Sequence, residues 1–278
     1  MTLAERFQAE IVMLHVATPE SHAAGVPSDD RHLAKWNLPA EILRASEQRS
    51  AGPTGAQQSA EQKFGASLLK RLETLPVRGA VVSGDPAPAI LRAAQSENAD
   101  LIMMASHGYP FEQFLLGSVT AKVLRWKECP VWTSAHTEPE PASPFSIRNI
   151  LCALDLGPRS QPAASWAAQL AAKFGAHLTL TKVTESMAIT APGGTWTNPR
   201  YQQSLVDDAS HRLTQLQKNL SIKADLLIGS GDTPKVLSQI ASQTKADLLV
   251  LDCYPYSGNL RIHGYAIIFT VSIPVLSV

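Results

Sequence analysis

Short apolar runs alternate with longer amphipathic segments along the second half of the chain. Each run carries apolar residues over about six positions, as a strand buried on both faces does. In the segments between the runs, Ala and Leu recur at helical spacing, and Pro234 opens one of these segments. The pattern predicts strands at 149–154, 178–183, 224–229, 246–251 and 273–278, and helices at 161–174, 204–220 and 233–243. Short strands separated by helices indicate an α/β fold with a parallel sheet covered on both faces.

The first half of the chain repeats this pattern in the same order. The matching blocks are 7–16 with 174–183 (offset 167), 84–104 with 231–251 (offset 147) and 129–131 with 273–275 (offset 144). The chain is therefore predicted to be a duplicated unit with domains at 1–136 and 145–278, the first and the second repeat. Three prolines fall within 137–144, and they cannot continue a helix or a central strand, so we expect a short linker there.

The first repeat begins late. At the offset of 167, Met1 corresponds to Ala168, which lies inside the first predicted helix of the second repeat. We therefore expect the first repeat to lack its first strand, the counterpart of 149–154. This strand is central in a doubly wound sheet, so its loss would leave a gap between the strands that normally flank it. Whether the strand is absent or the start is assigned too late stays open, and the DNA upstream of Met1 would decide.

Charge and composition narrow the class of protein. Lys and Arg number 24, and Asp and Glu number 24, so the formal net charge is zero. A nucleic-acid binder that relies on a broad basic surface is not expected, because such a surface needs an excess of positive charge. Apolar residues make up 45% of the chain, enough for packed cores, so pervasive disorder is excluded.

No segment indicates a membrane or a secretory pathway. Glu5, Arg6 and Glu10 interrupt any apolar signal peptide at the start. The most apolar late stretch, 265–278, has 14 residues, fewer than the roughly 20 that a membrane-spanning helix needs. The cysteines are scattered and form no disulfide framework or metal-binding pair; they are Cys129, Cys152 and Cys253. We expect a cytoplasmic protein that binds no metal.

Several motifs of the first repeat resemble those of the universal stress protein family. They are Gly84-Asp85-Pro86 followed by 99–104, Ser106-His107-Gly108, Leu115-Leu116-Gly117-Ser118-Val119 and Cys129-Pro130-Val131. The chain resembles a tandem member over nearly its whole length. The resemblance implies two Rossmann-like domains, each a doubly wound parallel sheet of strand order 3-2-1-4-5 with helices on both faces. It also implies that the last strands, 129–134 and 273–278, pair within one chain about a pseudo-twofold axis; a homodimer is the alternative.

Some members of the family bind ATP through a loop of Gly, two residues, Gly, nine residues, Gly and then Ser or Thr. The resemblance implies Gly108, Gly117, Ser118 and Val119 as the ligand contacts of the first repeat. The loop departs from the signature because Ala105 replaces the first Gly and only eight residues separate Gly108 from Gly117. Glycine lets backbone N–H groups approach phosphate oxygens, and a helix N-terminus favours an anion. The alternative is structural, with Ser118 as an N-cap and Gly108 as a turn residue.

The second repeat keeps a different part of the ligand site. The resemblance implies that Asp155, at the end of its first strand, helps to hold the nucleoside. The alternative is a loop aspartate that hydrogen-bonds its own backbone. At the positions that match the phosphate loop, the second repeat has a charge, a residue without an N–H and a bulky ring: Asp252, Pro255 and Tyr265. We therefore expect no triphosphate in the second repeat.

Two other features bear on chemistry. His107 falls at the carboxyl end of a predicted strand, where ligands bind, but no partner that would orient it is visible, so no catalytic role is expected. Asp100 and Asp247 precede buried strands and are expected to cap the starts of those strands.

The first functional hypothesis is a stress-response protein that binds or senses a small-molecule ligand without catalytic machinery of its own. Adenine nucleotide (ATP) in the first repeat is the candidate ligand. The second hypothesis is a structural or regulatory interaction protein with degenerate pockets, favoured by the departures at Ala105, Pro255 and Tyr265. An ATP-hydrolysing enzyme is the least favoured, because no base and no metal-binding carboxylate pair is found.

Overall fold

The computed structural model describes residues 2–17, 76–106, 117–134, 146–157, 160–184, 188–191, 194–252 and 260–278. The chain divides into two compact units. The smaller unit contains Met1–Glu97 and Pro139–Phe145, and the larger unit contains Asn98–Glu138 and Ser146–Val278. The predicted linker at 137–144 and the residue at its boundary, 136, lie outside the described residues. The division into domains at 1–136 and 145–278 stays a prediction.

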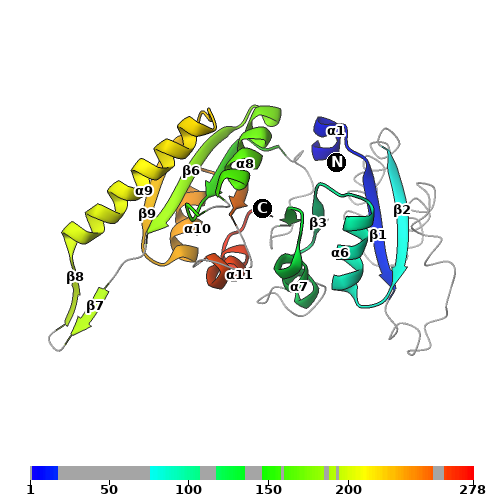
Figure 1. Cartoon of the computed structure of the whole chain (residues 1–278), viewed down its shortest axis with the longest axis horizontal. Coiled ribbons are helices and arrows are strands. Elements are labelled where there is room, and N and C mark those ends of the chain that lie inside the picture. Colours follow the sequence, from blue (N-terminus) through cyan, green and yellow to red (C-terminus); the bar gives the residue numbers. More distant parts are fainter. Residues whose placement is uncertain are drawn as a thin grey trace, which may run out of the picture. The chain divides into compact units, whose positions relative to one another are not determined.

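The smaller unit is built on two parallel strands. Strand β1 (Ile11–Ala17) pairs with β2 (Val77–Ser83) along its whole length. Helix α1 (Thr2–Phe7) precedes β1, and helix α6 (Pro86–Ser96) follows β2 and packs against both strands (Figure 1). The α6 helix begins directly after Asp85, because a proline at its first position has the backbone angle of a helix and needs no N–H partner.

The larger unit contains a seven-stranded sheet of order β3-β4-β11-β10-β5-β6-β9. The strands are β3 (Ile102–Met104), β4 (Val131–Thr133), β5 (Asn149–Ala153), β6 (His177–Thr184), β9 (Asp225–Ser230), β10 (Leu248–Leu251) and β11 (Val275–Ser277). In the second repeat, the order β9-β6-β5-β10-β11 corresponds to 3-2-1-4-5, so the predicted order is confirmed. All neighbouring pairs are parallel except β4 with β11.

No described strand joins β1 to β3. The two strands belong to different sheets, and β3 is the terminal strand of its sheet. In the second repeat the corresponding strands, β6 and β10, both pair with β5, which lies between them. Among the described residues, no counterpart of β5 pairs with β1 or with β3.

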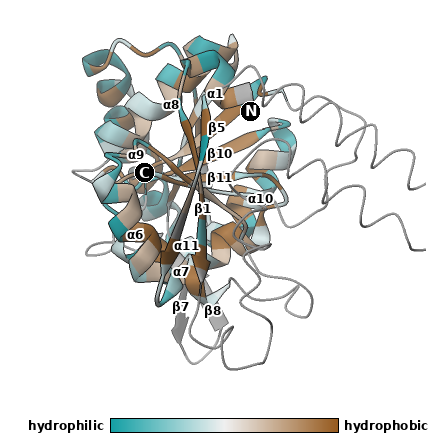
Figure 2. Ribbon diagram, turned by 90° about the vertical axis from the view of Figure 1, so that its right-hand side faces the viewer, coloured by the Kyte–Doolittle hydropathy of each residue, from teal (hydrophilic) through white to brown (hydrophobic). Residues whose placement is uncertain are grey.

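The helices of the larger unit cover the sheet. They are α7 (Ser118–Trp126), α8 (Ser160–Phe174), α9 (Pro199–Asn219), α10 (Thr233–Gln243) and α11 (Leu260–Thr270). Helices α8 and α9 lie on one side of the sheet and α10 on the other, and the strands between them are largely apolar (Figure 2). The residues of β5 and β10 from Ile150 to Ala153 and from Leu248 to Leu251 are buried, because they are central and covered on both faces.

The two repeats meet at their last strands with matching residues opposite each other. In the antiparallel pair of β4 with β11, Trp132 lies opposite Leu276, and these two residues are equivalent at the offset of 144 (276 − 132). A pseudo-twofold axis therefore passes between them. Lys127 Nζ also donates to the carbonyl of Ser277 at 2.6 Å. The predicted pairing of the last strands within one chain is confirmed.

Some elements were not predicted from the pattern. Strands β7 (Ala188–Ala191) and β8 (Gly194–Thr197) form an antiparallel pair, and α11 lies where no helix was assigned. Helix α9 begins at Pro199 rather than at 204, because the Asn198 side chain accepts the N–H groups of Arg200 and Tyr201.

Candidate functional site

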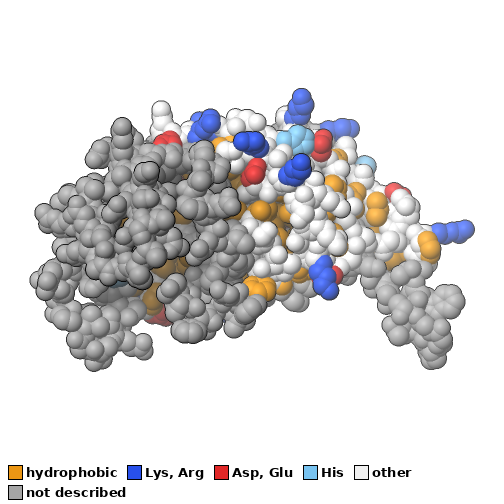
Figure 3. All heavy atoms as spheres, turned by 180° about the vertical axis from the view of Figure 1, so that it is seen from behind, with side chains coloured by type: hydrophobic (Ala, Val, Ile, Leu, Met, Phe, Trp, Pro, Cys, Tyr) orange, Lys and Arg blue, Asp and Glu red, His pale blue; other side chains and the backbone are white. Residues whose placement is uncertain are grey.

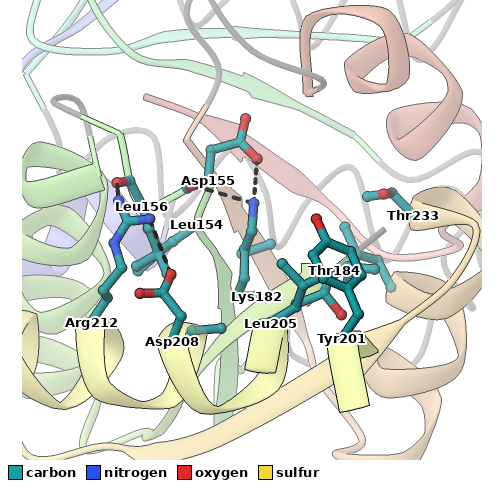
Figure 4. A pocket seen from close by; sticks show the side chains of 14 residues that line it. Leu154, Asp155, Leu156, Lys182, Thr184, Tyr201, Leu205, Asp208, Arg212 and Thr233 are labelled. Carbon is teal, nitrogen blue, oxygen red and sulfur yellow. Dashed lines mark hydrogen bonds and ion pairs between the residues drawn. The ribbon is translucent and has the colours of Figure 1, made fainter. Parts of the chain in front are cut away.

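A cavity of about 320 Å³ lies at the carboxyl ends of β5 and β6, between these strands and helices α9 and α10 (Figure 4). Ligands of open α/β sheets bind at this edge. The apolar part of the lining is Ala153, Leu154, Leu156, Val183, Leu205, Ala209 and Leu237. The polar part is Asp155, Lys182, Thr184, Tyr201, Asp208, Arg212 and Thr233.

Asp155 and Lys182 form an ion pair at one wall of the cavity. Asp155 follows β5 directly, and Lys182 lies in β6 beside that end of β5, because Ala153 pairs with Thr181. Lys182 Nζ lies 3.1 Å from Asp155 Oδ1 and 3.3 Å from the Asp155 carbonyl oxygen. About a quarter of each side chain is exposed, 24% for Asp155 and 22% for Lys182, so a ligand can reach both (Figure 4).

A second cation holds the loop that follows Asp155. Leu156 has φ 62°, a left-handed conformation that is uncommon for a leucine. Its carbonyl accepts a hydrogen bond from the Arg212 guanidinium, which also lies 3.6 Å from the Asp208 carboxylate one turn earlier on α9. The α9 helix therefore holds the loop after β5 in the conformation that shapes the cavity.

A buried carboxylate, that of Asp252, interacts with Asp155. Asp252 follows β10, is 5% exposed and accepts a hydrogen bond of 2.5 Å from Ser160 Oγ. Burial raises the pKa of Asp252; the Ser160 hydrogen bond opposes this rise, and the negative charge of Asp155 adds to it. A hydrogen bond from the Asp155 backbone N–H and the positive charge of Lys182 lower the pKa of Asp252. A further negative group, such as a phosphate, is disfavoured beside this pair of aspartates.

The first repeat brings three of its four predicted contacts to the end of β3. Gly117 is the N-cap of α7 and its N–H donates to the carbonyl of Ser106 at 3.0 Å; Ser118 and Val119 are the first two residues of the helix. The N-cap is Gly117, which has no side chain to cap the helix, so Ser118 is not the N-cap that the structural alternative assumed. Thr120 Oγ1 donates to the carbonyl of Ala105 at 2.9 Å and holds the helix start against β3. The fourth contact, Gly108, lies outside the described residues, as do His107 and Pro255.

The helices that precede the last strands correct one sequence match. Helices α7 and α11 both end four residues before a proline, at Trp126 and Thr270, so they correspond at the offset of 144. Tyr265 therefore corresponds to Ala121, and its hydroxyl donates to the Ala121 carbonyl at 3.0 Å. The prediction that Tyr265 takes the place of Ser118 is wrong, because Tyr265 lies inside α11 and not at its start.

Six of the seven polar side chains of the cavity were not singled out as site residues from the sequence: Lys182, Thr184, Tyr201, Asp208, Arg212 and Thr233. The sequence did contain a clue to Lys182, since it is the only charged residue in the predicted strand 178–183. It contained no clue to Tyr201 and Arg212, because they lie on one face of a long polar helix that reaches the site only in the folded chain.

The described residues also bear on two other classes of site, a membrane span and a metal site. Across the described ranges, no helix is both long enough and apolar enough to cross a membrane. No group of three or more His, Cys, Asp or Glu side chains in those ranges is arranged to hold a metal ion. On the described part of the face shown in Figure 3, basic and acidic side chains are interspersed.

Comparison with known proteins defines the family. The model of the universal stress protein family matches residues 1–134 and 146–254. A universal stress protein of Methanocaldococcus jannaschii is 26% identical over 132 residues, which are 47% of this chain and 68% of that protein. The chain therefore belongs to the universal stress protein family, whose members are stress-response proteins, and it carries two family domains in tandem.

Solved structures show the same fold. A universal stress protein from Archaeoglobus fulgidus matches with a TM-score of 0.60 at 18% identity, over 96% of this chain and 86% of that one. A functionally unknown protein from Pseudomonas aeruginosa matches with a TM-score of 0.58 at 16% identity, over 99% of this chain and 94% of that one.

Proposed function

We propose that this protein binds and senses a small ligand, and that the cavity of the second repeat is one of its binding sites. The observation that carries the proposal is the accessible Asp155–Lys182 pair in a cavity of about 320 Å³ at the carboxyl ends of two parallel strands. A volume of this order lies within the roughly 300–1,000 Å³ of small-molecule sites. The apolar walls would hold the body of a ligand, and the few polar groups would orient it.

The charges of the lining favour an uncharged ligand. Lys182 is paired with Asp155, and Arg212 with Asp208, so the formal charges of the lining cancel. The Asp155 carboxylate accepts hydrogen bonds from hydroxyl or amino groups of a ligand. A nucleoside combines these features, an apolar ring with donor groups, and the family resemblance implies that Asp155 holds one. Adenosine is therefore the first ligand to test.

The first repeat is proposed to bind the phosphates of an adenine nucleotide such as ATP. Gly117, Ser118 and Val119 form the first turn of α7, whose N-cap residue is a glycine, and Ser118 is exposed. Backbone N–H groups at such a turn favour an anion. Gly108 completes the proposed contact set.

Isothermal titration calorimetry with adenosine and with ATP tests the two sites separately. Asp155→Asn should weaken adenosine binding about tenfold, the effect of one lost charged hydrogen bond, and leave the affinity for ATP unchanged. Ser118→Ala should weaken ATP binding and leave adenosine unchanged. Asp207→Asn is the matched control, since Asp207 lies on α9 outside the cavity lining. Absence of heat with both ligands at millimolar concentration would reject adenosine and ATP as ligands and favour an interaction protein with degenerate pockets.

A further inference from the structure

Strand β3 of the first repeat and strand β10 of the second repeat are equivalent but have different neighbours. Both form the same bonds to the last strand of their repeat. Ile102 N–H donates to the Pro130 carbonyl and Leu249 N–H to the Pro274 carbonyl, both at 3.0 Å. On its other side β10 pairs with β5, whereas β3 is the terminal strand of the sheet. One edge of β3 is therefore unpaired among the described residues.

The turn that leads into each strand contains an equivalent residue with nearly the same φ. Asn98 and Lys245 are equivalent at the offset of 147 (245 − 98), and both have a positive φ, 48° and 49°. In the second repeat the Lys245 carbonyl accepts a hydrogen bond of 3.1 Å from the Asn149 side chain at the start of β5. The turn before β3 thus presents the backbone that receives β5 in the other repeat.

Asp247 holds the neighbouring strand and does not cap its own, which corrects the sequence expectation. Its Oδ2 accepts the backbone N–H groups of Arg148 at 2.8 Å and Asn149 at 2.9 Å, where β5 begins. Asp100, its equivalent before β3, is exposed, and no described residue donates a hydrogen bond to it. The first repeat therefore has the equivalent carboxylate, that of Asp100, but no described strand donates its backbone N–H groups to it.

The residues of β3 are also less buried than their equivalents in β10. Met103 is 55% exposed, whereas its equivalent Val250 is 0% exposed. Because Ile102 N–H and the Met104 carbonyl bond to residues beside β4, the backbone groups of Met103 and the N–H of Ala105 face the open edge, whereas the Ala105 carbonyl accepts from Thr120. In the second repeat Asp252, the equivalent of Ala105, donates its N–H to the Ala153 carbonyl of β5 at 3.2 Å. An apolar strand whose edge has backbone groups without a described partner is a template for pairing.

We propose that the open edge of β3 binds one extended apolar strand in parallel, in the way that β10 binds β5. The incoming strand enters beside Asp100, whose carboxylate accepts its first two backbone N–H groups. It covers Met103 and bonds to the backbone of Met103 and to the N–H of Ala105. By analogy with β5, its side chains are apolar over about five residues.

A peptide copied from this chain tests the proposal on the full-length protein. The probe is a fluorescent peptide of residues 147–155 with alanine in place of Cys152, and its binding is followed by anisotropy. The backbone of β5 alternates: Leu154 N–H donates to β6, so the N–H groups of Leu151 and Ala153 face β10. N-methylation at Leu151 and Ala153 should therefore weaken binding at least about tenfold. N-methylation at Ile150 and position 152, on the other edge, is the matched control and should retain it.

Two measurements locate the peptide. Hydrogen exchange should slow at Met103 and Ala105 when the peptide binds. Asp100→Ala should weaken binding about tenfold, whereas Glu128→Ala, an exposed acidic residue before β4, should not change it. The proposal is overturned if no saturable binding occurs, if the two N-methylated peptides bind equally, or if protection appears in β10 and not in β3.

Discussion

The strands β3 and β10 share one sequence pattern, but their residues contribute differently to the stability of the fold. Both follow Ala-Asp, both begin after a residue with positive φ, and both bond in the same way to the last strand of their repeat. Only β10 has β5 on its other side, and Val250 is fully buried while Met103 is more than half exposed. The contribution of each residue to stability therefore depends on the neighbouring strand and not on its own type.

The largest difference is expected at the two aspartates before these strands. Asp247→Ala should lower the free energy of unfolding by about 3 kcal/mol, since it removes two charge-assisted hydrogen bonds to the start of β5. Asp100→Ala should change it by less than about 0.5 kcal/mol, because no described residue bonds to that carboxylate. Urea unfolding of both variants measures the difference. Equal losses would mean that the two strand starts are alike.

The two apolar positions give a smaller contrast. Val250→Ala should cost about 2 kcal/mol, because it leaves a cavity at a position that is 0% exposed. Met103→Ala should cost less than about 0.5 kcal/mol at a position that is 55% exposed. Urea unfolding of both variants measures these two losses of stability. A large loss for Met103→Ala would show that β3 is covered in solution.

A third contrast concerns pH, at Asp252 and its equivalent Ala105. Burial raises the pKa of Asp252 in the folded state, so its stabilising contribution is complete below the ordinary aspartate value of about 3.9 and is lost as pH rises through the raised pKa. Asp252→Asn should remove this loss and flatten the stability profile above about pH 4.

Ala105→Asp is the matched variant, because it places a carboxylate at the exposed equivalent position. It should leave the profile of the parent protein unchanged. Thermal unfolding between pH 4 and pH 8 measures both profiles, over about the range in which a raised carboxyl pKa acts. An unchanged slope in Asp252→Asn would contradict the assignment of this slope to Asp252.

The smallest effect is expected at the helices beside the pseudo-twofold axis. Tyr265 donates to the carbonyl of its own equivalent, Ala121, and the tyrosine is 38% exposed. Tyr265→Phe should therefore cost about 0.5–1 kcal/mol, the value of one neutral hydrogen bond. Urea unfolding checks this value, and a loss of several kcal/mol would mean that the contact holds the two repeats together.

Much of the fold and part of the site could be predicted from local patterns. The apolar runs predicted the strands of the second repeat, the repeated blocks predicted the duplication, and the resemblance implied the strand order and the pairing of the last strands. Asp155 was also selected, since it follows a buried strand. Lys182 and Arg212 were not, because only the pairing of β5 with β6 and the packing of α9 bring their charges to Asp155 and to the Leu156 carbonyl.

The sequence by itself determined that this chain is a doubled α/β unit, because hydrophobic periodicity and repeated motifs act within a few residues of each other. Only the tertiary structure decided that Asp247 holds the start of β5, that Tyr265 meets Ala121 and that Met103 is exposed. Each of these facts depends on which segment, distant in the sequence, lies beside the residue. Identical local patterns cannot contain that information.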